Sequence, residues 1–97
     1  MRRADVLRLV EDHREELRER FAVRSLRLFG SVARDAAAEH SDVDFLVAFE
    51  GPPTFRDYMD LRIFLEDLLG VDVDLVTEGG LKEHARPSVE RDAIRVA

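Results

Sequence analysis

Two segments of the first half of the chain indicate its architecture: Leu28-Phe29-Gly30-Ser31 and, after ten further residues, Asp42-Val43-Asp44-Phe45-Leu46-Val47. Ser25 to Phe29 is a short run of period two that stops at Gly30, which predicts a strand leading into a sharp turn. The free N–H groups of a helix beginning at Ser31 would bind an anion, so the turn is a candidate phosphate-binding site. Val43–Phe49 is a second apolar run and predicts a second strand.

Two aspartates stand two residues apart at the start of this second strand. Their spacing places the Asp42 and Asp44 side chains on one face of the sheet, where they can converge on a hard cation. Asp44 lies inside an apolar run, where a carboxylate is unfavourable, so its presence there indicates a function. The third apolar run, Val71–Thr77, contains Asp72 and Asp74. If this strand lies beside the second, one of the two completes a cluster of three carboxylates.

Three carboxylates beside a phosphate-binding site are what magnesium-dependent phosphoryl or nucleotidyl transfer requires. The aspartate of the third strand could hold metal or accept the proton of the attacking hydroxyl, and the sequence does not separate these roles. A calcium loop is excluded because Leu46, Val47 and Ala48 occupy positions that need oxygen ligands or glycine. A P-loop is excluded because no Gly-Lys-Ser or Gly-Lys-Thr follows Gly30.

The remaining pattern predicts one small α/β (α+β) domain over residues 1–97, with a mixed sheet of three to four strands flanked by helices. An amphipathic helix is expected over Ala4–Phe21 and a short alanine-rich helix over Val32–Glu39. A long helix should begin after the cap Thr54 and end at Leu69 before Gly70. Pro87 should open a last short helix, and Ile94–Val96 should add an edge strand.

Composition narrows the class of function further. The net charge of −6 repels nucleic acid, so a polynucleotide partner is not expected. The absence of cysteine excludes disulfides and thiolate chemistry, and no apolar stretch has the length of a signal peptide or a membrane span. We therefore expect a cytoplasmic protein without a membrane partner.

The ordered motifs resemble those of the nucleotidyltransferase superfamily typified by DNA polymerase beta. The resemblance rests on Gly30-Ser31, Arg34 in a Gly-Ser-x-Ala-Arg run, the Asp42-x-Asp44 pair, and a later Val-Asp-Leu-Val-Thr that contains Asp74. The length, the N-terminal helix, and Leu81-Lys82 before a short terminal helix are similar to the minimal nucleotidyltransferases (MNT), the antitoxins of HEPN/MNT modules.

This resemblance implies a role for each matching residue. Gly30 and Ser31 would form the triphosphate-binding turn with Arg34 as a phosphate contact, although Asp35 stands where family members often have glycine. Asp42 and Asp44 would hold two Mg²⁺ ions, and Asp74, preferred to Asp72, would be the third carboxylate. The implied reaction transfers AMP from ATP to a tyrosine of a cognate HEPN ribonuclease toxin and silences it.

Two other functions stay open at this point. The chain could neutralise a toxin by binding alone, or it could transfer a nucleotide to a small hydroxylated molecule, with an oligomer supplying the acceptor pocket. Phe55, Met59 and Ile63 widen the apolar arc of the long helix, which predicts either contact with a partner or cover by another part of the chain. Tyr58 is expected to pack in the core. The three histidines, His13, His40 and His84, lack metal-ligand spacing.

Overall fold

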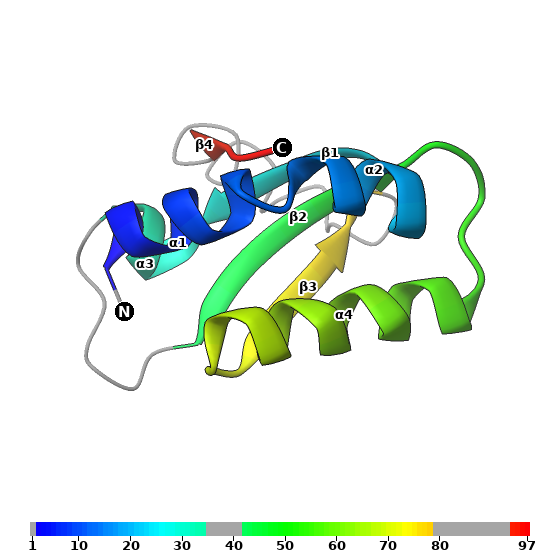
Figure 1. The fold of residues 1–97 in the computed structure, drawn as a ribbon. Coiled ribbons are helices and arrows are strands. Elements are labelled where there is room, and N and C mark those ends of the chain that lie inside the picture. Colours follow the sequence, from blue (N-terminus) through cyan, green and yellow to red (C-terminus); the bar gives the residue numbers. More distant parts are fainter. Residues whose placement is uncertain (1, 35–41, 79–93) are drawn as a thin grey trace.

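The computed structural model describes residues 2–34, 42–78 and 94–97 and shows a four-stranded mixed sheet. The strands are β1 (Val23–Phe29), β2 (Val43–Phe49), β3 (Val73–Thr77) and β4 (Ile94–Arg95), in the order β3-β2-β1-β4 (Figure 1). The β1 strand pairs antiparallel with both β2 and β4, whereas β2 and β3 are parallel. The predicted fold class is confirmed, and the third strand does lie beside the second.

Three helices pack on one face of the sheet, namely α1 (Arg3–Glu11), α2 (Arg14–Phe21) and α4 (Phe55–Leu69) (Figure 1). The fully buried side chains between these helices and the sheet are aliphatic apart from Phe45. The parallel pair β2 and β3 requires a crossover connection, which α4 provides. A single turn of helix, α3 (Gly30–Ala33), follows β1 directly. No helix in these described segments has the length and apolar character needed to cross a bilayer.

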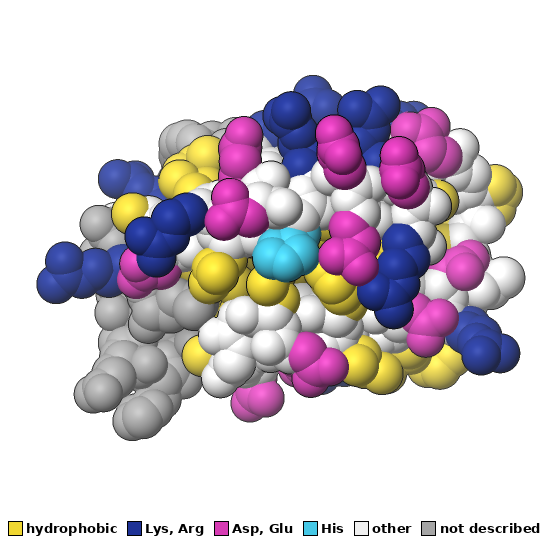
Figure 2. Space-filling model, viewed as in Figure 1, with side chains coloured by type: hydrophobic (Ala, Val, Ile, Leu, Met, Phe, Trp, Pro, Cys, Tyr) yellow, Lys and Arg dark blue, Asp and Glu magenta, His cyan; other side chains and the backbone are white. Residues whose placement is uncertain are grey.

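The prediction of one helix over Ala4–Phe21 is wrong, because the chain forms two helices with a break at Asp12 and His13. His13 has a non-helical backbone (φ −113°, ψ 16°), and its Nδ1 lies 2.8 Å from the carbonyl oxygen of Leu9. The imidazole packs edge-on against the ring of Phe64, and Figure 2 shows it in cyan beside hydrophobic side chains. The break lets both α1 and α2 bury apolar side chains against the same core.

The long helix begins and ends where its caps predict. Thr54 and Asp57 form a capping box, with each side chain accepting a hydrogen bond from the other residue's backbone N–H. Gly70 ends the helix in the left-handed conformation, with φ +71°. The residues that widen the apolar arc of α4 are covered only in part: Phe55 is 78% exposed and Ile63 50%, whereas Met59 is half-buried. Phe64, on the core side, packs on Phe21 of α2.

The C-terminal expectations are only partly covered by the described residues. The β4 strand confirms an edge strand beside β1, although it ends at Arg95 rather than Val96. The short helix expected to open at Pro87 lies outside the described residues, and so does most of the predicted Val32–Glu39 helix.

Candidate active site

The turn after β1 approaches the second strand so closely that only glycine fits. Gly30 has a φ of +75°, which side-chain-bearing residues rarely adopt. A Cβ atom at this position would lie 3.0 Å from Cγ of Asp44 and nearer still to its Oδ2. Two independent constraints therefore require glycine here: the backbone conformation and the proximity of the Asp44 carboxylate.

The sheet register places the carboxylates side by side. Asp44 pairs with Phe29 on β1, the residue before Gly30, and with Asp74 on the parallel strand β3. Asp42 lies immediately before β2 and is exposed. The structure therefore brings Asp44 and Asp74 into neighbouring positions next to the glycine turn, as the sequence motifs predict.

The electrostatics of Asp44 show that these carboxylates interact. Its pKa is raised from an ordinary value of 3.8 to about 6, chiefly because burial penalises the charged form. The negative charges of Asp74 and Asp42 raise this pKa further, as does a side-chain hydrogen bond with Asp74, while the positive charge of Arg34 lowers it. Arg34, which caps the end of α3, thus acts on the same site.

The choice between Asp74 and Asp72 follows from the same contacts. Asp74 is the residue that is in register with Asp44 and hydrogen-bonds its side chain. Asp72 is exposed and lies before β3, where its backbone carbonyl accepts a hydrogen bond from the N–H of Val43 (3.0 Å). Asp72 therefore contributes through its backbone to the start of the parallel pairing, whereas Asp74 contributes its carboxylate to the site.

The carboxylates at this site suit a magnesium ion whose remaining ligands are phosphate oxygens and water. Within residues 2–34, 42–78 and 94–97, no group of three or more Asp, Glu, His or Cys side chains is placed to hold a metal ion by itself. Mg²⁺ commonly binds through one or two carboxylates together with substrate phosphates and water, so such a group is not required. The oxygen ligands of Asp44 and Asp74, with Asp42 close enough to act on Asp44, suit this mode of binding.

Two side chains of α4 hold β3 on either side of Asp74. The hydroxyl of Tyr58 donates a hydrogen bond to the carbonyl oxygen of Leu75 (2.7 Å), and the N–H of Val73 donates to Oε2 of Glu66 (3.1 Å). The sequence predicts that Tyr58 packs in the core, and its hydroxyl bond to β3 adds a second role. Glu66 carries no sequence signal for this role, because its partner Val73 lies on the following strand. These bonds fix the strand segment that carries Asp74.

Tyr58→Phe should lower the free energy of unfolding by about 1 kcal/mol, since it removes the hydroxyl but keeps the ring. Urea unfolding followed by circular dichroism measures this change. Arg56→Lys, on an exposed position of α4, serves as a control and should leave stability nearly unchanged. Equal stability of Tyr58→Phe and wild type would show that the bond to β3 contributes nothing.

Asp44→Asn should stabilise the metal-free protein at pH 7. The folded-state pKa lies above the ordinary value, so the native state binds more protons than the unfolded state between about pH 4 and pH 6. Wild-type stability therefore falls as pH rises through this window, and the cost is fully present at pH 7. With allowance for solvent screening, we expect a gain of about 1 to 2 kcal/mol for the variant.

Urea unfolding at pH 4 and pH 7 in the presence of a chelator measures this difference. The gain should disappear at pH 4, where the Asp44 carboxyl is protonated in the folded wild type. A variant that is equally stabilised at both pH values would show that the carboxylate charge is not the cause.

Comparison with known proteins identifies the family of this chain. The sequence matches the nucleotidyltransferase domain family over residues 10–96. It is 46% identical to the protein adenylyltransferase MntA of Thermococcus cleftensis, over 87% of this chain and 85% of that protein. A solved structure provisionally identified as a minimal nucleotidyltransferase superposes with a TM-score of 0.81 at 45% identity, covering 97% of this chain and 95% of that one.

A more distant structure shares the fold. It is the complex of a tri-AMPylated HEPN toxin from Shewanella oneidensis with an MNT antitoxin; the matched chain has a TM-score of 0.67 at 20% identity, and 94% of this chain and 71% of that chain are covered. The family match spans most of this sequence, and the alignment with MntA covers most of both proteins. This protein therefore belongs to the nucleotidyltransferase domain family, together with the protein adenylyltransferases that its sequence resembles.

Proposed function

We propose that this protein is an antitoxin that transfers AMP from ATP to a tyrosine hydroxyl of a cognate HEPN ribonuclease toxin and so neutralises it. The observation that carries the proposal is the contact of the Gly30 turn with Asp44, which is itself in register with Asp74. The similarity to a protein adenylyltransferase supports a protein acceptor. The fold shared with an MNT antitoxin bound to an AMPylated HEPN toxin supports the class of that acceptor.

The residues of the site divide between the nucleotide and the metal. The Gly30-Ser31 turn binds the triphosphate, and Arg34, whose charge already reaches Asp44, contacts a phosphate. Asp42, Asp44 and Asp74 would hold magnesium, with two ions expected. Bound magnesium neutralises the phosphates and lowers the pKa of the attacking hydroxyl.

In this reaction the tyrosine oxygen forms a bond to the α-phosphorus of ATP, and the bond between the α-phosphorus and the bridging oxygen to the β-phosphate breaks. Pyrophosphate leaves, AMP remains on the tyrosine, and the hydroxyl proton passes to a nearby base. Asp74 is exposed at the site and can accept that proton where it is not bound to metal.

The acidic net charge is in keeping with a protein acceptor rather than nucleic acid, and we propose that the reaction takes place in the cytoplasm.

The test uses the protein, magnesium and an extract of its source cells, with ATP labelled at the α- or the γ-phosphate in parallel reactions. AMP transfer should give a labelled acceptor band with the α-label only, and chelation of magnesium should remove it. A band labelled from the γ-phosphate would instead indicate a kinase reaction. No labelled protein in the presence of the folded enzyme and a co-expressed HEPN toxin would contradict the proposal.

A further inference from the structure

A groove lies between α2, α4 and the loop that follows β2, at the other end of β2 from the carboxylates. Its volume is about 580 Å³, within the range of ligand-binding cavities. Apolar side chains line it, namely Phe21, Phe49, Pro52, Pro53, Ile63 and Phe64. Asp44 is near the start of β2 and Phe49 at its end, a separation of roughly 16 Å along the strand. The groove and the candidate active site can therefore be occupied together.

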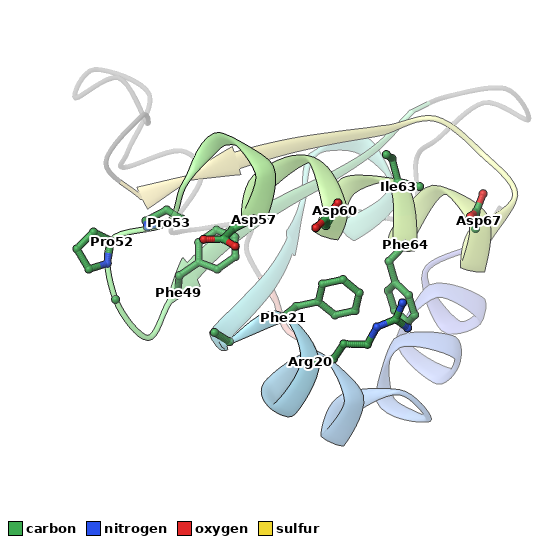
Figure 3. A pocket seen from close by; sticks show the side chains of 12 residues that line it. Arg20, Phe21, Phe49, Pro52, Pro53, Asp57, Asp60, Ile63, Phe64 and Asp67 are labelled. Atoms are coloured by element: carbon green, nitrogen blue, oxygen red, sulfur yellow. The ribbon is translucent and has the colours of Figure 1, made fainter.

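The floor of this groove is already formed by side chains from both helices. The rings of Phe21 and Phe64 pack with their centroids 4.8 Å apart. The guanidinium of Arg20 lies 5.0 Å from the centroid of Phe21 and 5.9 Å from that of Phe64, and Figure 3 shows it extending across the Phe64 ring. Beside this floor, Ile63 is 50% exposed, so apolar surface remains available to an occupant.

The polar side chains around the floor make the groove acidic. Asp57, Asp60 and Asp67 all line it from α4 (Figure 3). Asp57 accepts the capping hydrogen bond from the N–H of Thr54, and Asp60 lies 3.9 Å from Nε of the exposed Arg56. Arg20 already pairs with Glu16 (Nη1 to Oε2, 2.7 Å), so its positive charge offsets little of the negative charge of the groove. An occupant with complementary charge would carry apolar side chains for the aromatic floor and basic side chains for the carboxylates.

We propose that this groove docks a basic amphipathic segment of the protein acceptor. Apolar side chains of that segment cover the Phe21 and Phe64 rings, and its lysine or arginine side chains pair with Asp60 and Asp67. This inference rests on the proposed transfer to a protein. It adds a docking surface remote from the nucleotide, which would hold the acceptor while its tyrosine enters the active site.

A first experiment tests the groove without an enzyme assay. The ¹⁵N-labelled protein is titrated with a helical amphipathic peptide of leucine and arginine, followed by amide resonances. Residues 20–22 and 60–67 should shift, whereas Gly30 and Ser31 should not. A peptide with glutamate in place of arginine should bind at least about tenfold more weakly, and so should one with serine in place of leucine. Equal binding of all three peptides, or shifts confined to other surfaces, would overturn the proposal.

A second experiment uses variants of the protein. Asp60→Asn with Asp67→Asn should weaken binding of the leucine and arginine peptide by about five- to tenfold. The same variant should raise KM for the acceptor in the transfer assay and leave KM for ATP unchanged. Glu11→Gln with Glu19→Gln removes two charges from exposed positions elsewhere and should change neither value.

The two proposals fail in different ways. If the wild type transfers no AMP but binds the peptide in the groove, the transfer function fails and the docking surface stands. If transfer proceeds and the Asp60 and Asp67 variant keeps its acceptor KM and peptide affinity, the docking surface is wrong. A dimer in light scattering that Ile63→Ser dissociates would overturn it in favour of a second copy of this chain.

Discussion

Replacing both Asp42 and Asp44 by asparagine should reduce AMP transfer by at least about a thousandfold. Asparagine keeps the shape of each side chain but removes the negative charge that a hard cation requires. Burial and the neighbouring carboxylates disfavour the negative charge of Asp44, so a bound cation would stabilise that charge strongly. The measurement is α-label incorporated into the acceptor over time, with circular dichroism to show that the variant is folded.

Glu11→Gln with Glu19→Gln is the matched control, because it removes the same amount of charge from exposed helical positions. It should transfer AMP at the wild-type rate. Full transfer by the folded aspartate variant would remove the carboxylates from the mechanism. If that variant loses transfer but still neutralises the toxin in cells, neutralisation depends on binding and not on catalysis.

Gly30→Ala should lower AMP transfer by about a hundredfold or more, because a displacement of about 1 Å in a catalytic group has an effect of this size. The new Cβ would overlap the Asp44 carboxylate and displace it from its position beside Asp74. The positive φ adds a backbone cost of about 1 to 2 kcal/mol to the free energy of unfolding. Transfer rate and urea unfolding are measured on the same preparation.

Gly70→Ala separates these two effects. Gly70 has a similar φ of +71°, but a Cβ there meets no other atom within 4 Å. This control should lose comparable stability from backbone strain and yet keep AMP transfer close to wild type. If both glycine variants lose transfer to the same extent, the defect comes from destabilisation and the contact between Gly30 and Asp44 has no catalytic importance.

Local sequence signals predicted much of the fold. The second strand has the predicted bounds, Val43–Phe49, because turn-forming residues follow it and apolar residues fill it. The long helix has the predicted start and end because Thr54 and Gly70 satisfy its free backbone groups. The local pattern does not predict the break at His13, whose imidazole packs against Phe64, a residue 51 positions away in the chain.

The order of the strands along the chain, the caps of α4 and the spacing of the site motifs can be read from the sequence, because these features depend on neighbouring residues. The fold was needed to show that Asp74, and not Asp72, lies beside Asp44, since strand register depends on pairing across the sheet. It also decided how much of the apolar arc of α4 is covered by α2 and how much remains at the groove. Burial and charge act through space, so the raised pKa of Asp44 likewise follows from groups that the fold brings together.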